Sequence, residues 1–171
     1  MNIDMNRKTT YVSTPYDARI SELNDSLNTT YLSYGTLGSR NKKNQTTQDN
    51  NSRSFGLENK VSRAVSKSSH NYYNAHWDLI DASKKEDFDI DKIKNSTLPL
   101  VMQSMTKSEK LAYIKKMSDK REKINNEIRT LNKKRITYIN SQQTTNGESS
   151  LDFAMLNAIK KQAIQKGFKF D

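Results

Sequence analysis

Cysteine is absent from the 171 residues, and glycine and proline are scarce, with five and two copies. Without cysteine the chain has no disulfide, no thiolate metal ligand and no cysteine nucleophile. Five scattered glycines form no glycine-rich loop of the kind that cradles a phosphate group. No apolar run approaches the roughly 20 residues that a membrane span needs. These absences exclude several classes of enzyme and predict that the chain has no transmembrane helix.

Apolar residues are also few, at 33% of the chain, and the mean hydropathy is −0.96. Such a composition predicts one domain or an elongated helical piece with a small core, and some mobile segments. The N-terminus contains no apolar core of a signal peptide, so we expect the chain as it stands to remain in the cytoplasm.

Few residues of the chain suit catalysis or metal binding. The two histidines, His70 and His76, are six residues apart, and no carboxylate follows at a spacing that would complete a ligand set. The alternating acids of 87–91 resemble the start of a calcium loop. That loop requires glycine at its sixth position and glutamate at its twelfth, where this chain has Lys92 and Leu98. We therefore predict a protein that is not an enzyme, with no catalytic, cofactor-binding or metal-binding residue and no cofactor.

Positive charge is abundant, since the formal net charge is +10. Between Val101 and Gln143 eleven Lys or Arg side chains accompany four Asp or Glu side chains, which leaves a local charge of +7. One interpretation is a surface for nucleic acid, and the other is the solvated face of a helix. The basic residues surround the expected helix instead of forming one stripe, and no aromatic residues are interleaved to stack on bases, which favours the solvated face.

The same region predicts one long helix over residues 106–142. Thr106 and Glu109 have the spacing of a capping box, and no glycine or proline follows for more than thirty residues. Mostly apolar residues recur at heptad spacing, Ile114, Arg121, Ile128 and Arg135 along one line and Met117, Ile124, Leu131 and Tyr138 along the other. The two arginines make this a weak coiled coil by itself, so the helix needs a partner. We expect helix–helix contacts from Leu111, Ile114, Ile124, Ile128 and Leu131.

Three further segments are predicted from local patterns. Residues 1–13 form a tail with a short strand at 8–12, and residues 14–35 form a helix capped by Thr14 and stopped by Gly35. Residues 36–54 are almost wholly polar and predict a flexible linker, with a weak helix at 45–51 as the alternative.

The remaining residues, 55–171, form a helical region. Within it Trp77 is expected to anchor its segment to the first helix and to the long one. A last helix at 150–166, stopped by Gly167, is expected to return along the long helix and cover part of its seam. The predicted fold class is therefore mostly α, an elongated helical bundle or helical hairpin with one long helix, a short N-terminal strand and a disordered linker.

Several motifs, in the same order, resemble the region that follows the von Willebrand factor A (VWA) domain in a family of bacterial VWA proteins. They are Ser13-Thr-Pro-Tyr-Asp17, Leu23-Asn-Asp-Ser-Leu-Asn-Thr-Thr-Tyr31, Tyr34-Gly35, Gln48-Asp49, Val61-Ser-Arg-Ala-Val65, Trp77-Asp-Leu-Ile-Asp-Ala82, Met105-Thr-Lys-Ser-Glu-Lys110 and Lys166-Gly-Phe168. The resemblance implies that the strand at 8–12 is a remnant of a missing α/β domain. The metal-ion motif of that domain, Asp-x-Ser-x-Ser, is absent: Asp81-Ala-Ser83 comes nearest, but Lys85 replaces the second serine.

The resemblance implies a non-catalytic structural or protein-interaction module, the C-terminal part of a truncated VWA-domain protein. Its partner would be another protein or a second copy, bound through apolar helix faces, and no small-molecule substrate is expected. The alternative is a basic helical module that binds nucleic acid through residues 107–135. Full-length relatives are expected to be extracytoplasmic, so the localisation of the parent protein is left open.

Overall fold

The described part of the chain is mostly helical, which confirms the predicted mostly-α class. The computed structural model describes residues 11–145 and 150–168, except for the side chains of residues 143–157. No strand occurs in these ranges, and β-pairing is limited to one isolated bridge between Ser33 and Asp78. The helices are α1 (Asp17–Asn28), α2 (Gly38–Ser54), α3 (Leu57–Ser68), α4 (Leu79–Ala82), η1 (Ile90–Lys92), η2 (Asn95–Thr97), α5 (Leu100–Gln103), α6 (Lys107–Thr145) and α7 (Ser150–Gln165).

The residues divide into two units, one ending at Ile136 and the other beginning at Thr137, and α6 runs through both. The second unit contains the end of α6 and α7. Gly167 has a φ of 87°, and the N–H of Phe168 donates to the carbonyl of Ala163 at 3.0 Å. This left-handed closure confirms Gly167 as the stop of the last helix. The contact between this helix and the seam of α6 stays a prediction.

The long helix begins as its sequence predicts. The carboxylate of Glu109 accepts the backbone N–H of Thr106 at 2.7 Å, while the Thr106 hydroxyl accepts the N–H of Glu109 at 3.3 Å. This reciprocal pair is the predicted capping box, and it satisfies two donors at the helix start. The helix ends at Thr145, three residues beyond the predicted end.

The first helix is shorter than predicted, since α1 covers Asp17–Asn28 and not 14–35. Its beginning is fixed by the Asp17 carboxylate, which accepts both the N–H and the hydroxyl of Thr14 at 2.8 Å. After Asn28 the chain turns inward, and the N–H of Leu32 donates to the Asp78 side chain at 2.9 Å. In a longer helix the N–H of Leu32 would donate to the carbonyl of Asn28. It donates to Asp78 instead, so the helix ends early.

The flexible linker predicted for 36–54 is wrong, because these residues form the 17-residue helix α2. The helix has almost no apolar stripe and is held by polar contacts instead. Gln45 and Asp49 are buried, and Lys42 donates to the backbone carbonyls of Asn28 and Tyr31 at 2.8 and 3.0 Å. The polar composition of this segment therefore belongs to a helix with a hydrogen-bonded interface. The helix considered as the alternative at 45–51 lies within it.

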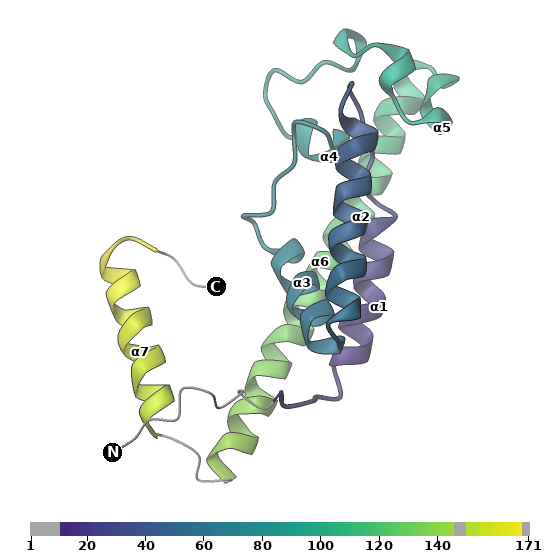
Figure 1. Cartoon of the computed structure of the whole chain (residues 1–171). Helices are drawn as coiled ribbons and strands as arrows, with labels where there is room; N and C mark the ends of the chain where they lie inside the picture. The colour runs from purple at the N-terminus through teal and green to yellow at the C-terminus, as the bar shows by residue number, and fades with distance from the viewer. Residues whose placement is uncertain (1–10, 146–149, 169–171) are drawn as a thin grey trace. The chain divides into compact units, whose positions relative to one another are not determined.

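The predicted strand at 8–12 lies mostly outside the described residues, and Tyr11 and Val12 belong to no strand. Helices α1 and α3 lie side by side, and α2 packs against α3 (Figure 1).

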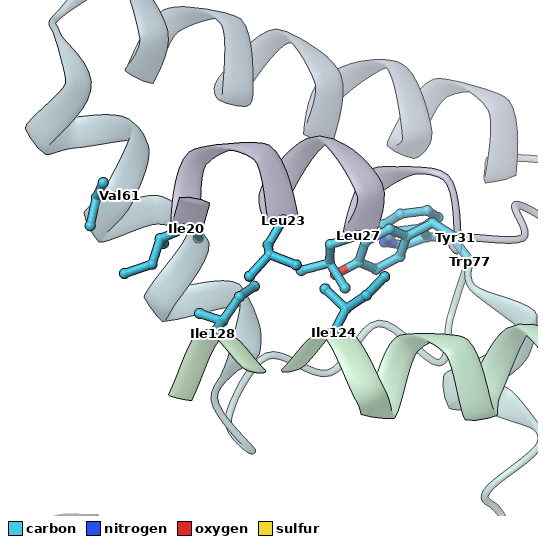
Figure 2. Close-up of a cluster of buried hydrophobic side chains, with 9 residues drawn as sticks. Ile20, Leu23, Leu27, Tyr31, Val61, Trp77, Ile124 and Ile128 are labelled. Carbon is cyan, nitrogen blue, oxygen red and sulfur yellow. The ribbon is translucent and has the colours of Figure 1, made fainter. Parts of the chain in front are cut away.

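The first unit has two apolar cores. One joins α1, α3 and the middle of α6, where Ile20, Leu23 and Leu27 face Ile124 and Ile128 (Figure 2). Trp77 packs into this core at 4% exposure, as predicted. The second core lies nearer the start of α6, and its buried members are Leu32, Leu79, Ile80, Ile90, Leu98, Met102 and Ile114.

Most of the predicted contact residues of α6 are covered by the chain's own helices. Ile114, Ile124 and Ile128 are buried, and Leu131 packs against the first core. Leu111 is wrong as a contact residue, since it is 42% exposed. Two apolar cores lie along one face of α6, and Arg121 lies between Ile114 and Ile124.

Candidate functional site

Charged side chains also gather in the interior of the first unit. Arg121 is 5% exposed and Lys67 is 2% exposed. Burying such groups costs several kcal/mol unless each is paired and hydrogen-bonded. The members of this group come from four helices or their ends, and we call it the buried charge cluster: Lys42, Asp49, Arg63, Lys67, Asp78, Asp81 and Arg121.

Tyr31 lies at the centre of the cluster. Its ring stacks on Trp77 with centroids 5.8 Å apart and meets the edge of Tyr72 at 6.4 Å. The guanidinium of Arg121 lies 4.1 Å from the ring centroid, and the ammonium groups of Lys42 and Lys67 lie at 5.4 and 5.6 Å. Each cation is attracted by the electrons of the ring face, an interaction that strengthens where water is excluded. Three cations therefore lie close to one aromatic ring.

Arg121 makes five hydrogen bonds with its guanidinium. Nη1 and Nη2 donate to the two carboxylate oxygens of Asp78 at 2.6 and 3.1 Å, and Nη1 also reaches Asp81 at 3.4 Å. Nε and Nη2 donate to the hydroxyl and the carbonyl of Thr30 at 3.0 Å. The planar fork of arginine suits this bidentate pairing, which joins α6 to the chain segments after α1 and before α4.

Asp78 is held by more than Arg121. Its carboxylate accepts the N–H of Leu32 at 2.9 Å and caps α4 by accepting the N–H of Asp81 at 3.2 Å. Asp81 in turn accepts the N–H of Asn74 at 2.9 Å and the ammonium of Lys84 at 3.0 Å. Hydrogen-bond donors therefore surround both carboxylates inside the fold.

Lys67 forms the second half of the cluster. Its ammonium donates to Asp49 at 2.7 Å and to Asn24 at 3.0 Å, and also to the side-chain oxygen of Asn28. Arg63 shares the same Asp49 carboxylate at 2.7 Å. The Lys67 ammonium thus has three acceptors, Asn24 and Asn28 on α1 and Asp49 on α2, and it joins these two helices to α3.

Burial changes the proton affinity of these groups. Desolvation lowers the pKa of Lys67 to about 8, although its hydrogen bond to Asp49 acts in the opposite direction. Desolvation also lowers the pKa of Lys42 to about 8. For Arg121 desolvation is the largest single influence, but the hydrogen bond to Asp78 and the charges of Asp78 and Asp81 together outweigh it, and the pKa is raised. Burial raises the pKa of Tyr31 far above its ordinary value, so its hydroxyl stays protonated.

A polar cavity of about 110 Å³ opens beside the cluster. Its wall combines the end of α3 with the loop after it, the residues after α4 and one face of α6. Lys67, Lys84, Arg121 and Arg129 line it together with Asp81. Two features distinguish this cavity chemically: its lining is mainly polar, and cations outnumber carboxylates there.

A smaller ion pair fastens the far part of α6 within the same unit. Arg135 donates to Asp17 at 2.9 Å, and the Tyr11 hydroxyl donates to the same carboxylate. Desolvation and the hydrogen bond to Asp17 raise the pKa of Tyr11 to about 12. Both arginines of the predicted seam therefore hold buried carboxylates.

The residues considered from sequence for metal binding are separated in the structure. His70 and His76 are both exposed, and only His70 lines the cavity. Asp91 pairs with Lys107 at the start of α6, which gives this acid a structural contact. In the described ranges no group of three His, Cys, Asp or Glu side chains is close enough to hold a metal ion.

The sequence did not identify Lys67, Asp49 or Tyr31 as members of one cluster. Two signals were present: the acids of the Trp77–Asp81 motif interrupt an apolar run, and Arg121 interrupts an apolar seam. An acid and a base that each break an apolar face predict a buried pair. No comparable local signal marks Lys67, whose partners lie 18 to 43 positions away.

None of the helices in the described part of the chain combines the length and the apolar character that a membrane span requires. No family model matches this chain, and neither a curated protein nor a solved structure matches it.

Proposed function

We propose that the chain is a non-catalytic structural and protein-interaction module, the C-terminal helical region of a VWA-type protein. The observation that carries the proposal is the use made of the interior charges. Arg121, Lys67 and their carboxylate partners hold one another and bridge different helices. A catalytic acid or base must be able to exchange its proton with a substrate, whereas these groups are engaged in fixed contacts.

The motifs behind the VWA resemblance support this assignment, because they supply the interior. Tyr31, Asp49, Val61, Trp77 and Asp78 come from four separate motifs, and all five are buried. Residues that build one interior must occur together in a chain that adopts it. Residues of the motifs that resemble the VWA-protein region therefore contribute to one interior.

The surface that we propose for a partner lies on α5 and the beginning of α6. Leu100 is 85% exposed, Val101 is 53% exposed and Leu111 is 42% exposed. Apolar side chains left in water on consecutive helices are typical of interaction surfaces. The partner to which the proposal commits is the VWA domain of a protein in the resembled family, joined to the helical region in one chain.

Binding to a purified VWA domain of that family tests the proposal. We expect saturable binding in a calorimetric titration, and the double variant Leu100→Asp and Val101→Asp should weaken it by about tenfold or more. The matched control is Phe55→Asp, the same kind of change at a residue that is 78% exposed between α2 and α3. Equal losses in both variants, or no binding by the unaltered chain, would contradict the proposal.

Nucleic-acid binding is the weaker alternative. Three arginines of the basic region make internal contacts: Arg121 with Asp78, Arg135 with Asp17, and Arg129 with the carbonyl of Ser68 at 2.7 Å. Arg121 and Arg135, which pair with buried carboxylates, are thereby withdrawn from phosphate contacts. Electrostatic binding to DNA would fall steeply as salt rises from low to moderate concentration, whereas apolar docking would not, so a salt series separates the two functions.

A further inference from the structure

The cavity beside the buried charge cluster has an excess of positive charge. The cations Lys67, Lys84, Arg121 and Arg129 line it, and Asp81 is the carboxylate among its lining residues. The charges of Asp78 and Asp49 compensate Arg121 and Lys67 from behind the wall, but Asp49 is shared with Arg63. The intramolecular ion pairs thus leave positive charge facing the cavity.

Arg129 and Lys84 supply most of this excess. Arg129 donates to the carbonyl of Ser68 at 2.7 Å and to the side-chain oxygen of Asn126, and both acceptors are neutral. Lys84 donates to Asp81, a carboxylate that Arg121 also uses. The side chain of Lys84 is 55% exposed, so its ammonium retains donors for a ligand that enters from solvent. Two cations, one on α6 and one in the segment after α4, therefore line the same cavity and are available to one anion.

Asn125 adds an independent observation that points to a ligand. It lines the cavity, and its side-chain oxygen is buried without a hydrogen-bond partner among the described residues. A buried polar atom that lacks a partner costs about 1–3 kcal/mol. The oxygen and nitrogen of an amide exchange places by a half-turn of the group, so Asn125 can present a donor to the cavity as readily as an acceptor.

The size of the cavity limits what it can hold. A volume of about 110 Å³ compares with roughly 30 Å³ for one water in the liquid and with about 300–1,000 Å³ for sites that take drug-sized molecules. It accommodates a few waters or one small polyatomic ion. A nucleotide or a peptide segment is too large.

We propose that this cavity binds a small oxyanion of the size of inorganic phosphate, held by Lys84, Arg129 and His70. Hydrogen bonds from cationic donors to an oxyanion are about twice as strong as bonds between neutral groups. His70 is exposed at the edge and adds a ring N–H. Anion binding would also ease the repulsion that Lys67 experiences from Lys42 and Arg63, which contributes to its lowered pKa.

Titration of the full chain with inorganic phosphate tests this site. Ionic strength is held constant with chloride, and binding is followed by the midpoint of thermal unfolding and by the phosphorus NMR signal. We expect saturable stabilisation, as mass action requires of a ligand that binds only the folded chain. Lys84→Met should weaken the affinity by about fivefold or more, equivalent to about 1 kcal/mol. Lys84 is partly exposed, so this variant is expected to fold.

The matched control is Lys116→Met, which removes the same charge from an exposed position of α6 that does not line the cavity. The control should bind phosphate like the unaltered chain. Stabilisation that rises without saturation, and equally in both variants, would be a general salt effect and would overturn the proposal. Saturable binding lost in Lys116→Met but kept in Lys84→Met would place the anion elsewhere and would also overturn it.

Discussion

Arg121 and Lys67 are both buried cations, yet the fold treats them differently. Their side chains are 6% and 0% exposed, so the loss of water is similar. The pKa of Arg121 is raised by its surroundings, whereas that of Lys67 is lowered to about 8. The difference comes from their partners, since Arg121 faces two carboxylates and Lys67 faces one that it shares with Arg63.

This comparison shows that the charge of the partners, more than the depth of burial, decides whether a buried cation is compensated. The bidentate bond from Arg121 to Asp78 satisfies both members of a pair at once. Lys67 completes its hydrogen bonds with the neutral oxygens of Asn24 and Asn28. Neutral acceptors satisfy its donors without cancelling its charge, so the Arg121 side of the cluster should contribute more to stability.

Asp78→Ala should give the largest effect. The substitution leaves Arg121 buried beside a single carboxylate, and it also removes the cap of α4 and the acceptor of the Leu32 N–H. Loss of one partner from a buried pair costs about 3–5 kcal/mol. Urea unfolding followed by circular dichroism measures the change in the free energy of unfolding. A loss below about 1 kcal/mol would show that the pair is not a main support of the fold.

Lys67→Met should cost less. Asp49 keeps Arg63 at 2.7 Å and the amide of Asn28 at 2.6 Å, so its carboxylate is not left without donors. Met fills a similar volume, and the desolvation cost of the ammonium disappears. We expect a loss of about 1–2 kcal/mol in the same unfolding experiment. If Lys67→Met cost as much as Asp78→Ala, the proposed difference between the two halves of the cluster would be wrong.

The apolar framework could be predicted from sequence because its signals are local. The capping box at Thr106, the periodic apolar residues of α6 and the anchoring role of Trp77 all depend on neighbouring residues or on helical spacing. Leu111 shows the limit of periodicity, since an apolar residue at the expected helical spacing is still exposed when none of the described elements covers that turn.

The polar interior could not be predicted in the same way. Lys42, Asp49 and Lys67 belong to segments whose composition is typical of surface or linker, and their partners are distant in the chain. Hydrogen bonds to distant residues leave no periodic pattern, so α2 was mistaken for a linker. Arg121 and Asp78 could have been found, because each interrupts an otherwise apolar face.

The pH dependence of stability should separate the two cations further. The pKa of Lys67 is about 8 in the folded chain against about 10.5 ordinarily, so above pH 8 the unfolded chain binds more protons and stability rises with pH. We expect a gain of about 1 kcal/mol from Lys67 between pH 7 and about pH 9. Arg121 stays charged in both states and contributes no slope there.

Urea unfolding at pH 7, 8 and 9 measures the slope, and Lys67→Met should reduce it. Lys42 acts in the same direction, because its pKa is also lowered to about 8, so part of the rise should remain. Measurements should stop near pH 9.5. The raised pKa of Tyr31 means that above about pH 10 the unfolded chain loses the phenolic proton first, and stability then falls. A slope unchanged by Lys67→Met would contradict the lowered pKa.

Asp119→Ala should give the smallest effect, and it completes the comparison on the surface of the same helix. Asp119 accepts from Lys115 at 3.2 Å, one helical turn away, and the two side chains are 52% and 77% exposed. Water solvates each charge well without the other, so such a pair contributes about 0.3–0.5 kcal/mol. We expect the free energy of unfolding to fall by about this amount, and high salt should remove the difference. A loss as large as that of Asp78→Ala would mean that charge pairing on α6 acts independently of burial, which would contradict the reasoning about Arg121.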